Sequence, residues 1–218
     1  HTSNSSAIWV QGAMSGERPR DFTVTNNIGN DSYGHLITLR YALDAVLVEG
    51  NVLDKAGNNP YGAPDPAGNC IAVAWYDGTY ASTNYIIRNN DLNDTSIAPN
   101  KSLILLQQSV NNLLIEKNYF HGAPAYAGID IIGNYDNLII RNNVFHVFPA
   151  IWRGVLSFSA GMGSGYGFSN NVKIHNNTFV SSPKYDGIIF FNKGTNAAPA
   201  PHFTNIDIRN NIFDFTYG

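Results

Sequence analysis

Seven segments of the chain repeat one pattern of apolar and polar residues. Each segment contains an asparagine, and the residues three and five positions before it are apolar in every segment. Apolar residues at every second position are typical of a β-strand that buries one face. The pattern therefore predicts seven equivalent strands, separated by loops of different length. The aligned asparagines are Asn27, Asn51, Asn90, Asn118, Asn143, Asn177 and Asn211.

A second short apolar run precedes each of these strands. Two short strands per repeat, with no helical period and a repeat of 24 residues or more, indicate coils that stack parallel to one another. The sequence thus predicts an all-β fold, a parallel β-helix of about seven coils, in a single domain over residues 1–218. Neither end carries an amphipathic cap, so we expect flanking residues or another chain to cover the ends. The second runs are 7–10, 35–39, 71–75, 103–106, 128–132, 154–158 and 187–191.

Asparagine is unusually frequent in this chain, with 29 in 218 residues. In a stack of parallel coils, equivalent positions of neighbouring coils lie about 4.8 Å apart. Asparagines at one corner can then form hydrogen bonds along the stack, as a ladder, and tolerate the left-handed backbone of a sharp corner. We therefore expect the aligned asparagines to have a structural role.

The segments around the last four aligned asparagines resemble the repeats of a known group of proteins. They read NNLLIEKNYF, DNLIIRNNVF, NNVKIHNNTF and TNIDIRNNIF, and they are similar to repeats of right-handed parallel β-helix proteins of the pectate-lyase-like superfamily. The resemblance covers essentially the whole chain and implies a right-handed β-helix with an extracellular, carbohydrate-related role. That superfamily includes polysaccharide lyases, glycoside hydrolases, phage tailspikes, epimerases, surface adhesins and glycan-binding modules. No catalytic motif of one lyase or hydrolase family matches residue by residue.

Two columns of outward residues are expected on the aligned strands. Two positions before the aligned asparagine, charges of opposite sign alternate from the second coil to the fifth, which predicts a ladder of exposed ion pairs. A catalytic Glu116 between Arg88 and Arg141 is the functional alternative. Four positions before the asparagine, Leu47, Ile86, Leu114 and Ile139 form an apolar outer strip, which we expect a loop, a missing segment or another subunit to cover. The first column is Thr25, Glu49, Arg88, Glu116, Arg141, His175 and Arg209.

Three loops that follow the aligned strands end in the same way, with an aromatic residue, any residue, and glycine. The aromatic residues are Tyr126, Trp152 and Tyr185. Consecutive coils would superpose them into a column, on which the apolar faces of sugar rings could stack. The alternative is that these aromatic side chains close a corner of the core. The sequence thus offers two interpretations of this corner, a glycan-binding surface or a structural contact.

The same corner carries candidate catalytic residues. A lyase that acts on uronates needs a cation to neutralise the carboxylate and a base to remove the neighbouring proton. The candidate cations are Arg153 and Lys184, and the candidate bases are His121, His146 and Tyr126. A hydrolase needs two carboxylates, and here only Asp186 and Asp130 are candidates. Asp130 should face outward if its neighbours Ile129 and Ile131 face inward. The lyase interpretation is the easier of the two.

Three hypotheses about function follow from these residues and from the resemblance. The first is an extracellular protein that binds, and as a lyase cleaves, a polysaccharide. The second is a noncatalytic glycan-binding adhesin that uses the same aromatic column. The third is a structural subunit of a fibre, which assembles by self-association through the ends of the stack. The sequence leaves open whether the protein is an enzyme.

Composition argues against other classes of partner. The net charge is −3 and the charged fraction is 13%, with no basic stripe, which disfavours nucleic acid as a partner. No apolar stretch reaches the 18 residues that a membrane-spanning helix needs, so we expect no membrane insertion. The single cysteine, Cys70, excludes an internal disulfide framework and a zinc site built from cysteines. The N-terminal segment HTSNSSAIWV has no features of a signal peptide.

Cofactor and modification sites have weak signals. We expect no cofactor, with Ca²⁺ as the single alternative, because oxygen ligands from adjacent loops could gather one ion. The candidate calcium ligands are Asp54, Asp65, Asp91 and Asp94. The glycine-rich segment 159–170 lacks the lysine of a phosphate-binding loop. Five asparagines match the N-x-S/T rule for glycosylation: Asn4, Asn30, Asn93, Asn100 and Asn176.

Overall fold

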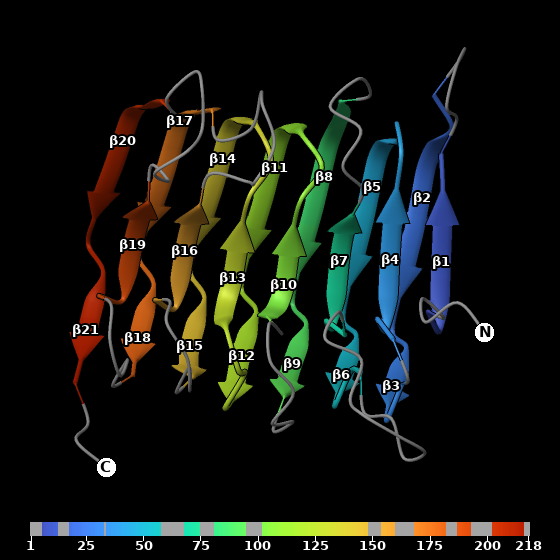
Figure 1. Ribbon diagram of the computed structural model, residues 1–218, viewed down its shortest axis with the longest axis horizontal. Helices are drawn as coiled ribbons and strands as arrows, with labels where there is room; N and C mark the ends of the chain where they lie inside the picture. The colour runs from blue at the N-terminus through green and yellow to red at the C-terminus, as the bar shows by residue number, and fades with distance from the viewer. Residues whose placement is uncertain are drawn as a thin grey trace.

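The computed structural model describes 6–12, 18–32, 34–57, 68–74, 81–94, 102–147, 154–159, 168–181, 187–192 and 202–215. These residues form the strands β1 to β21 and no helix. The strands build three sheets of seven strands each (Figure 1). Strands that are three apart along the chain pair in parallel, as β2 does with β5 and β5 with β8. The predicted parallel β-helix of about seven coils is therefore confirmed.

The two series of predicted strands form the first two sheets. Sheet 1 consists of β1 (Ile8–Gln11), β4 (Ile37–Arg40), β7 (Ile71–Ala74), β10 (Ser102–Leu106), β13 (Ala127–Ile131), β16 (Leu156–Ser159) and β19 (Ile189–Asn192). Sheet 2 consists of β2 (Arg20–Thr25), β5 (Asp44–Glu49), β8 (Ser82–Arg88), β11 (Val110–Glu116), β14 (Tyr135–Arg141), β17 (Phe168–His175) and β20 (His202–Arg209).

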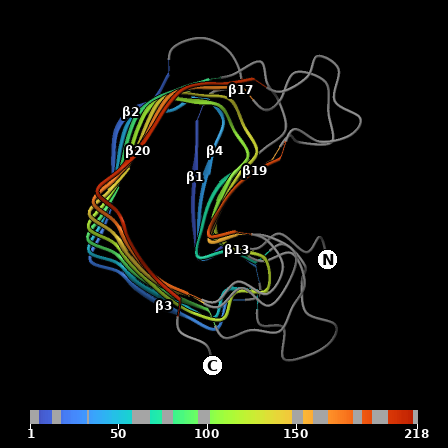
Figure 2. The same cartoon turned by 90° about the vertical axis from the view of Figure 1, so that its left-hand side faces the viewer.

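The prediction of two strands per repeat is wrong, because each coil has a third strand directly after the aligned asparagine. Viewed along the stack, the three sheets form three sides of one cross-section (Figure 2). The third strands are short because each needs only one or two inward residues to close the core. Sheet 3 consists of β3 (Ile28–Asn30), β6 (Val52–Asp54), β9 (Asp91–Asp94), β12 (Tyr119–Gly122), β15 (Val144–Val147), β18 (Thr178–Val180) and β21 (Ile212–Asp214).

The core contains columns of identical or similar side chains, because parallel pairing in register places equivalent residues above one another. The inward residues of sheet 3 include a column of four phenylalanines, Phe120, Phe145, Phe179 and Phe213. Successive rings are stacked, with centroids 4.4, 4.8 and 5.2 Å apart. The first three rings are fully buried. Offset stacking of this kind adds to the energy of burial.

The predicted asparagine ladder lies at the corner between sheets 2 and 3. Asn90 shows the repeating geometry: its Nδ2 donates to Oδ1 of Asn118 at 2.9 Å and to the carbonyl of Val48 at 3.0 Å. The backbone N–H of Asn90 donates to the same Oδ1 at 3.0 Å. The contact between side-chain amides recurs in every coil from Asn27 to Asn211. Each amide thus satisfies polar groups that the corner would otherwise bury unpaired.

The left-handed residue of this corner is the one before the ladder asparagine. The sequence predicts the ladder and the left-handed backbone at the same asparagine, whereas the structure divides them between two neighbouring residues. The left-handed residues are Asn26, Gly50, Asn89, Lys117, Asn142, Asn176 and Asn210, with φ from 54° to 67°. A second left-handed position lies five residues earlier, at Asp21, Ala45, Asn84, Asn112, Asn137, Asn171 and Asn205. Asparagine tolerates this conformation better than most residues, so these positions also explain its excess.

The outer face of sheet 2 carries the two predicted columns. Arg88 Nε lies 2.9 Å from Glu49 Oε1, and Arg141 Nε lies 2.8 Å from Glu116 Oε2. The hydrogen bonds from Arg88 lower the pKa of Glu49 below its ordinary value. The predicted ladder of exposed ion pairs is therefore present in part: these residues form two separate pairs between neighbouring coils, and Glu116 is buried, with 7% of its surface exposed. The residues of the apolar outer strip are in register and half-buried.

Candidate functional site

The predicted corner is only partly within the described residues. Trp152, Arg153, Lys184, Tyr185 and Asp186 lie outside them. The proposed aromatic column and both candidate cations therefore stay predictions. The structure places the other four candidates, namely Tyr126, Asp130, His121 and His146.

His121 and His146 lie side by side on the outer face of sheet 3, in register on β12 and β15. His121 Nε2 is 2.6 Å from Oδ1 of Asp91 on β9. The imidazole also stacks on Tyr119, with ring centroids 4.5 Å apart and an angle of 14° between the planes. A carboxylate bound to one ring nitrogen fixes the orientation of a histidine. The sequence did not predict the Asp91 partner.

Asp130 belongs to a different sheet from the two histidines. It lies on β13 of sheet 1, between the inward residues Ile129 and Ile131, and so faces outward as predicted. It is nevertheless buried, with 3% of its surface exposed, and Ser159 Oγ lies 3.2 Å from its Oδ1. Tyr126 is half-buried in the turn between β12 and β13. The four described candidates are therefore divided between two sheets and a turn.

The described calcium candidates have other partners. Asp54 Oδ1 accepts a hydrogen bond from Asn93 Nδ2 at 2.9 Å, and its Oδ2 lies 3.6 Å from Lys55 Nζ. Asp91 is paired with His121, and Asp94 lies on the opposite, inward face of β9. Within the described ranges, no group of three or more histidine, cysteine or acidic residues is arranged to hold a metal ion. Asp65, the fourth candidate, lies outside those ranges.

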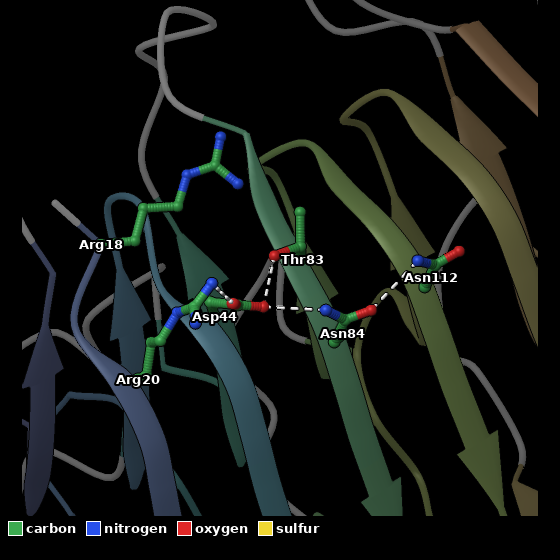
Figure 3. Close-up of a pocket in the computed structure, with 6 residues that line it drawn as sticks. All are labelled: Arg18, Arg20, Asp44, Thr83, Asn84 and Asn112. Carbon is green, nitrogen blue, oxygen red and sulfur yellow. Dashed lines mark hydrogen bonds and ion pairs between the residues drawn. The ribbon is translucent and has the colours of Figure 1, made fainter.

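A pocket that the sequence analysis did not identify lies where the first strands of sheet 2 begin (Figure 3). It has a volume of about 740 Å³. Its residues come from four successive coils and from the segment before β2, so no short motif in the sequence marks them. All of them are polar or charged: Arg18, Arg20, Asp44, Thr83, Asn84 and Asn112.

Asp44 is the centre of the hydrogen bonds in this pocket. Its Oδ1 accepts from Thr83 Oγ1 at 2.5 Å and from Asn84 Nδ2 at 2.8 Å, and its Oδ2 lies 3.1 Å from Arg20 Nη2. The hydrogen bonds from Thr83 and Asn84, with the nearby charge of Arg20, lower the pKa of Asp44 below its ordinary value. The carboxylate is therefore ionised at neutral pH and is a weak base.

Arg18 is the second cation of the pocket, and its side chain is exposed. Figure 3 shows its guanidinium directed away from the Arg20–Asp44 pair. Within the part of the chain that the structure describes, Arg18 forms no ion pair. A guanidinium offers five N–H donors in a planar arrangement that suits a carboxylate or a sulfate. The pocket can therefore hold a ligand with hydroxyl groups and at least one anionic group.

Comparisons with known proteins give no match to a protein family, to a curated protein or to a solved structure. None of the described segments forms a helix with the length and apolar character required to cross a membrane.

Proposed function

We propose that the protein binds a polysaccharide in the pocket formed by Arg18, Arg20, Asp44, Thr83 and Asn84. The observation that supports this most directly is the arrangement of the pocket, in which the Arg18 guanidinium, which forms no ion pair among the described residues, lines the same space as a fixed row of carboxylate, hydroxyl and amide groups. Sugar hydroxyls both donate and accept hydrogen bonds, and this row offers acceptors and donors for them. The resemblance to pectate-lyase-like β-helix proteins supports the same class of ligand and an extracellular location.

Binding is favoured over cleavage by the acid–base properties of these residues. Guanidinium groups do not release protons at physiological pH. The hydrogen bonds that lower the pKa of Asp44 also make its carboxylate a weak base. The pocket is thus suited to hold a ligand in place, and the role that follows is a glycan-binding module or adhesin.

Replacing Arg18 with glutamine should weaken the binding of an acidic polysaccharide by about tenfold, because one charged hydrogen bond is lost. Isothermal titration calorimetry with polygalacturonate, alginate and glucuronoxylan at physiological ionic strength measures this change. Lys117→Asn is the matched control. It removes one exposed positive charge directly after the end of β11, whereas the pocket lies where the strands of sheet 2 begin, and asparagine suits the left-handed backbone of this position. An equal loss of affinity in both variants would show that Arg18 acts only through long-range attraction between opposite charges, and not through a contact in the pocket. Absence of binding to all three polymers would refute the proposal.

Polysaccharide cleavage by a lyase is the second candidate function, and the His121–Asp91 pair is the observation that favours it. In such a reaction, the histidine removes the proton next to the uronate carboxylate, a double bond forms as the C–O bond to the leaving sugar breaks, and the leaving oxygen takes a proton from water. We expect unsaturated products, detected by their absorbance near roughly 235 nm, to form with the parent and to fall about a hundredfold or more with His121→Ala. Val144→Ala, on the exposed face of the neighbouring strand β15, is the control. Binding without any such product supports the adhesin, and the absence of both supports the structural subunit.

A further inference from the structure

A strip of polar residues continues from the pocket along the whole length of sheet 2. It consists of two adjacent columns, seven and six residues before each ladder asparagine, and we call it the polar strip. The first column is Arg20, Asp44, Thr83, Asn111, Asp136, Asn170 and Thr204, in register from coil to coil. The second column is the left-handed series Asp21, Ala45, Asn84, Asn112, Asn137, Asn171 and Asn205.

Hydrogen bonds between coils hold the side chains of the polar strip in place. Asn112 Nδ2 donates to Asn84 Oδ1, and Asn137 Nδ2 donates to Asn112 Oδ1, both at 3.0 Å. Further along, Asn170 Nδ2 donates to Asp136 Oδ1 at 3.0 Å, and Thr204 Oγ1 donates to Asn170 Oδ1 at 2.9 Å. The strip is therefore a fixed array, and a ligand that binds to it loses little additional side-chain entropy.

The asparagines of the strip retain unused hydrogen-bonding capacity on their exposed side. A side-chain amide has two N–H groups and two lone pairs on oxygen. Asn112 uses one N–H and one lone pair within its column, and its side chain is exposed. Its second N–H and second lone pair are therefore available to solvent or to a ligand. Among the described residues, Asn84 likewise uses one N–H and one lone pair, and Asn137 uses one N–H, so a donor and an acceptor recur at each of these coils, about 4.8 Å apart.

Charge along the strip is uneven. Its first end carries Arg18 and Arg20 in the pocket, together with the carboxylates of Asp44, which is paired with Arg20, and of Asp21. From Asn111 onward, Asp136 is the only charged residue in the two columns. Its carboxylate accepts hydrogen bonds from Asn170 and Asn171 and lies on the exposed surface. A ligand with an acidic group on every sugar would be repelled there, whereas an uncharged, hydroxyl-rich chain would not.

We propose that the polar strip binds a linear glycan along the axis of the stack, with an acidic group in the pocket and mostly neutral sugars over Asn112 and Asn137. This inference rests on the proposed function, because the pocket supplies the first contact. It specifies the ligand further, as a chain several sugars long in which acidic groups are sparse. Glucuronoxylan, a neutral backbone with occasional glucuronic acid, has this chemistry.

The test compares short and long oligosaccharides of glucuronoxylan that each carry one glucuronic acid. We expect the parent to bind the octasaccharide about tenfold more tightly than the disaccharide, because more sugars contact the strip. The double variant Asn112→Gly/Asn137→Gly should lose this advantage, since glycine keeps the left-handed backbone but removes both amides. Asn142→Gly/Asn176→Gly is the matched control at the opposite corner, where the same substitutions remove exposed, left-handed asparagines outside the strip. Thermal unfolding of both double variants checks that they fold.

The outcomes separate this inference from the proposed function. The strip is excluded if the length of the oligosaccharide does not change the affinity, or if the longer chain keeps its advantage in Asn112→Gly/Asn137→Gly. If Arg18→Gln still weakens binding in either case, the pocket remains supported. If fully acidic oligogalacturonate of the same length binds as tightly as the glucuronoxylan octasaccharide, the argument from Asp136 is wrong. If no oligosaccharide binds to the parent, both the strip and the pocket are refuted.

Discussion

Replacing Asn143 with leucine should lower the free energy of unfolding by about 3 kcal/mol or more, because several buried polar groups lose their partners at once. The Asn143 side chain is 1% exposed. Its Nδ2 donates to Asn177 Oδ1 and to the carbonyl of Ile115, both at 3.0 Å, and its Oδ1 accepts from Nδ2 and the backbone N–H of Asn118. Leucine branches at the same position as asparagine, but it is larger and can make none of these hydrogen bonds.

Urea denaturation followed by circular dichroism measures this loss. The control is Asn142→Gly, which changes the exposed neighbour and keeps its left-handed backbone. We expect the control to alter the stability by no more than about 0.5 kcal/mol. A similarly small change for Asn143→Leu would show that the ladder contributes little to stability.

Replacing Phe145 with alanine should destabilise the protein by about 3 to 5 kcal/mol, through lost burial and the cavity that remains. Its ring is fully buried between Phe120 and Phe179, with centroid distances of 4.4 and 4.8 Å. The parallel backbones on both sides hold the neighbouring rings in place, so the cavity cannot collapse fully. Denaturant unfolding measures the effect, with Val144→Ala on the exposed face of the same strand as the control. Equal effects of the two substitutions would contradict the stacked core.

Sheets 1 and 2 and the ladder could be predicted from the sequence because each leaves a local, repeated signal. Val46 and Val48 alternate with outward residues on one strand, and Asn51 follows at a fixed distance. The third sheet leaves a weaker signal, because a strand of three or four residues such as β18 buries only Phe179 within its length. An alternation needs more residues than this to be recognised.

The candidate site depends on register, which the sequence does not display. Arg20, Asp44 and Thr83 are far apart in the chain and become neighbours only through the pairing of β2, β5 and β8. The His121–Asp91 contact likewise requires the alignment of β12 with β9 in the unpredicted third sheet. The repeated polar pair before each buried stretch, such as Asn111-Asn112, is the signal that could have revealed the polar strip.

The hydrogen bonds of the strip and of the ladder run in opposite directions along the molecule. In the ladder, each Nδ2 donates toward the next coil, as Asn90 does to Asn118. In the strip, each Nδ2 donates toward the preceding coil, from Asn137 through Asn112 to Asn84. The amide dipoles of the two columns therefore oppose one another between Asn84 and Asn137. The strip's column ends where Asn84 Nδ2 donates to Asp44, so its positive end points at that carboxylate. Because amides in such a chain polarise one another, we expect Asn112 and Asn137 to strengthen the hydrogen bond by which Asn84 stabilises the Asp44 anion.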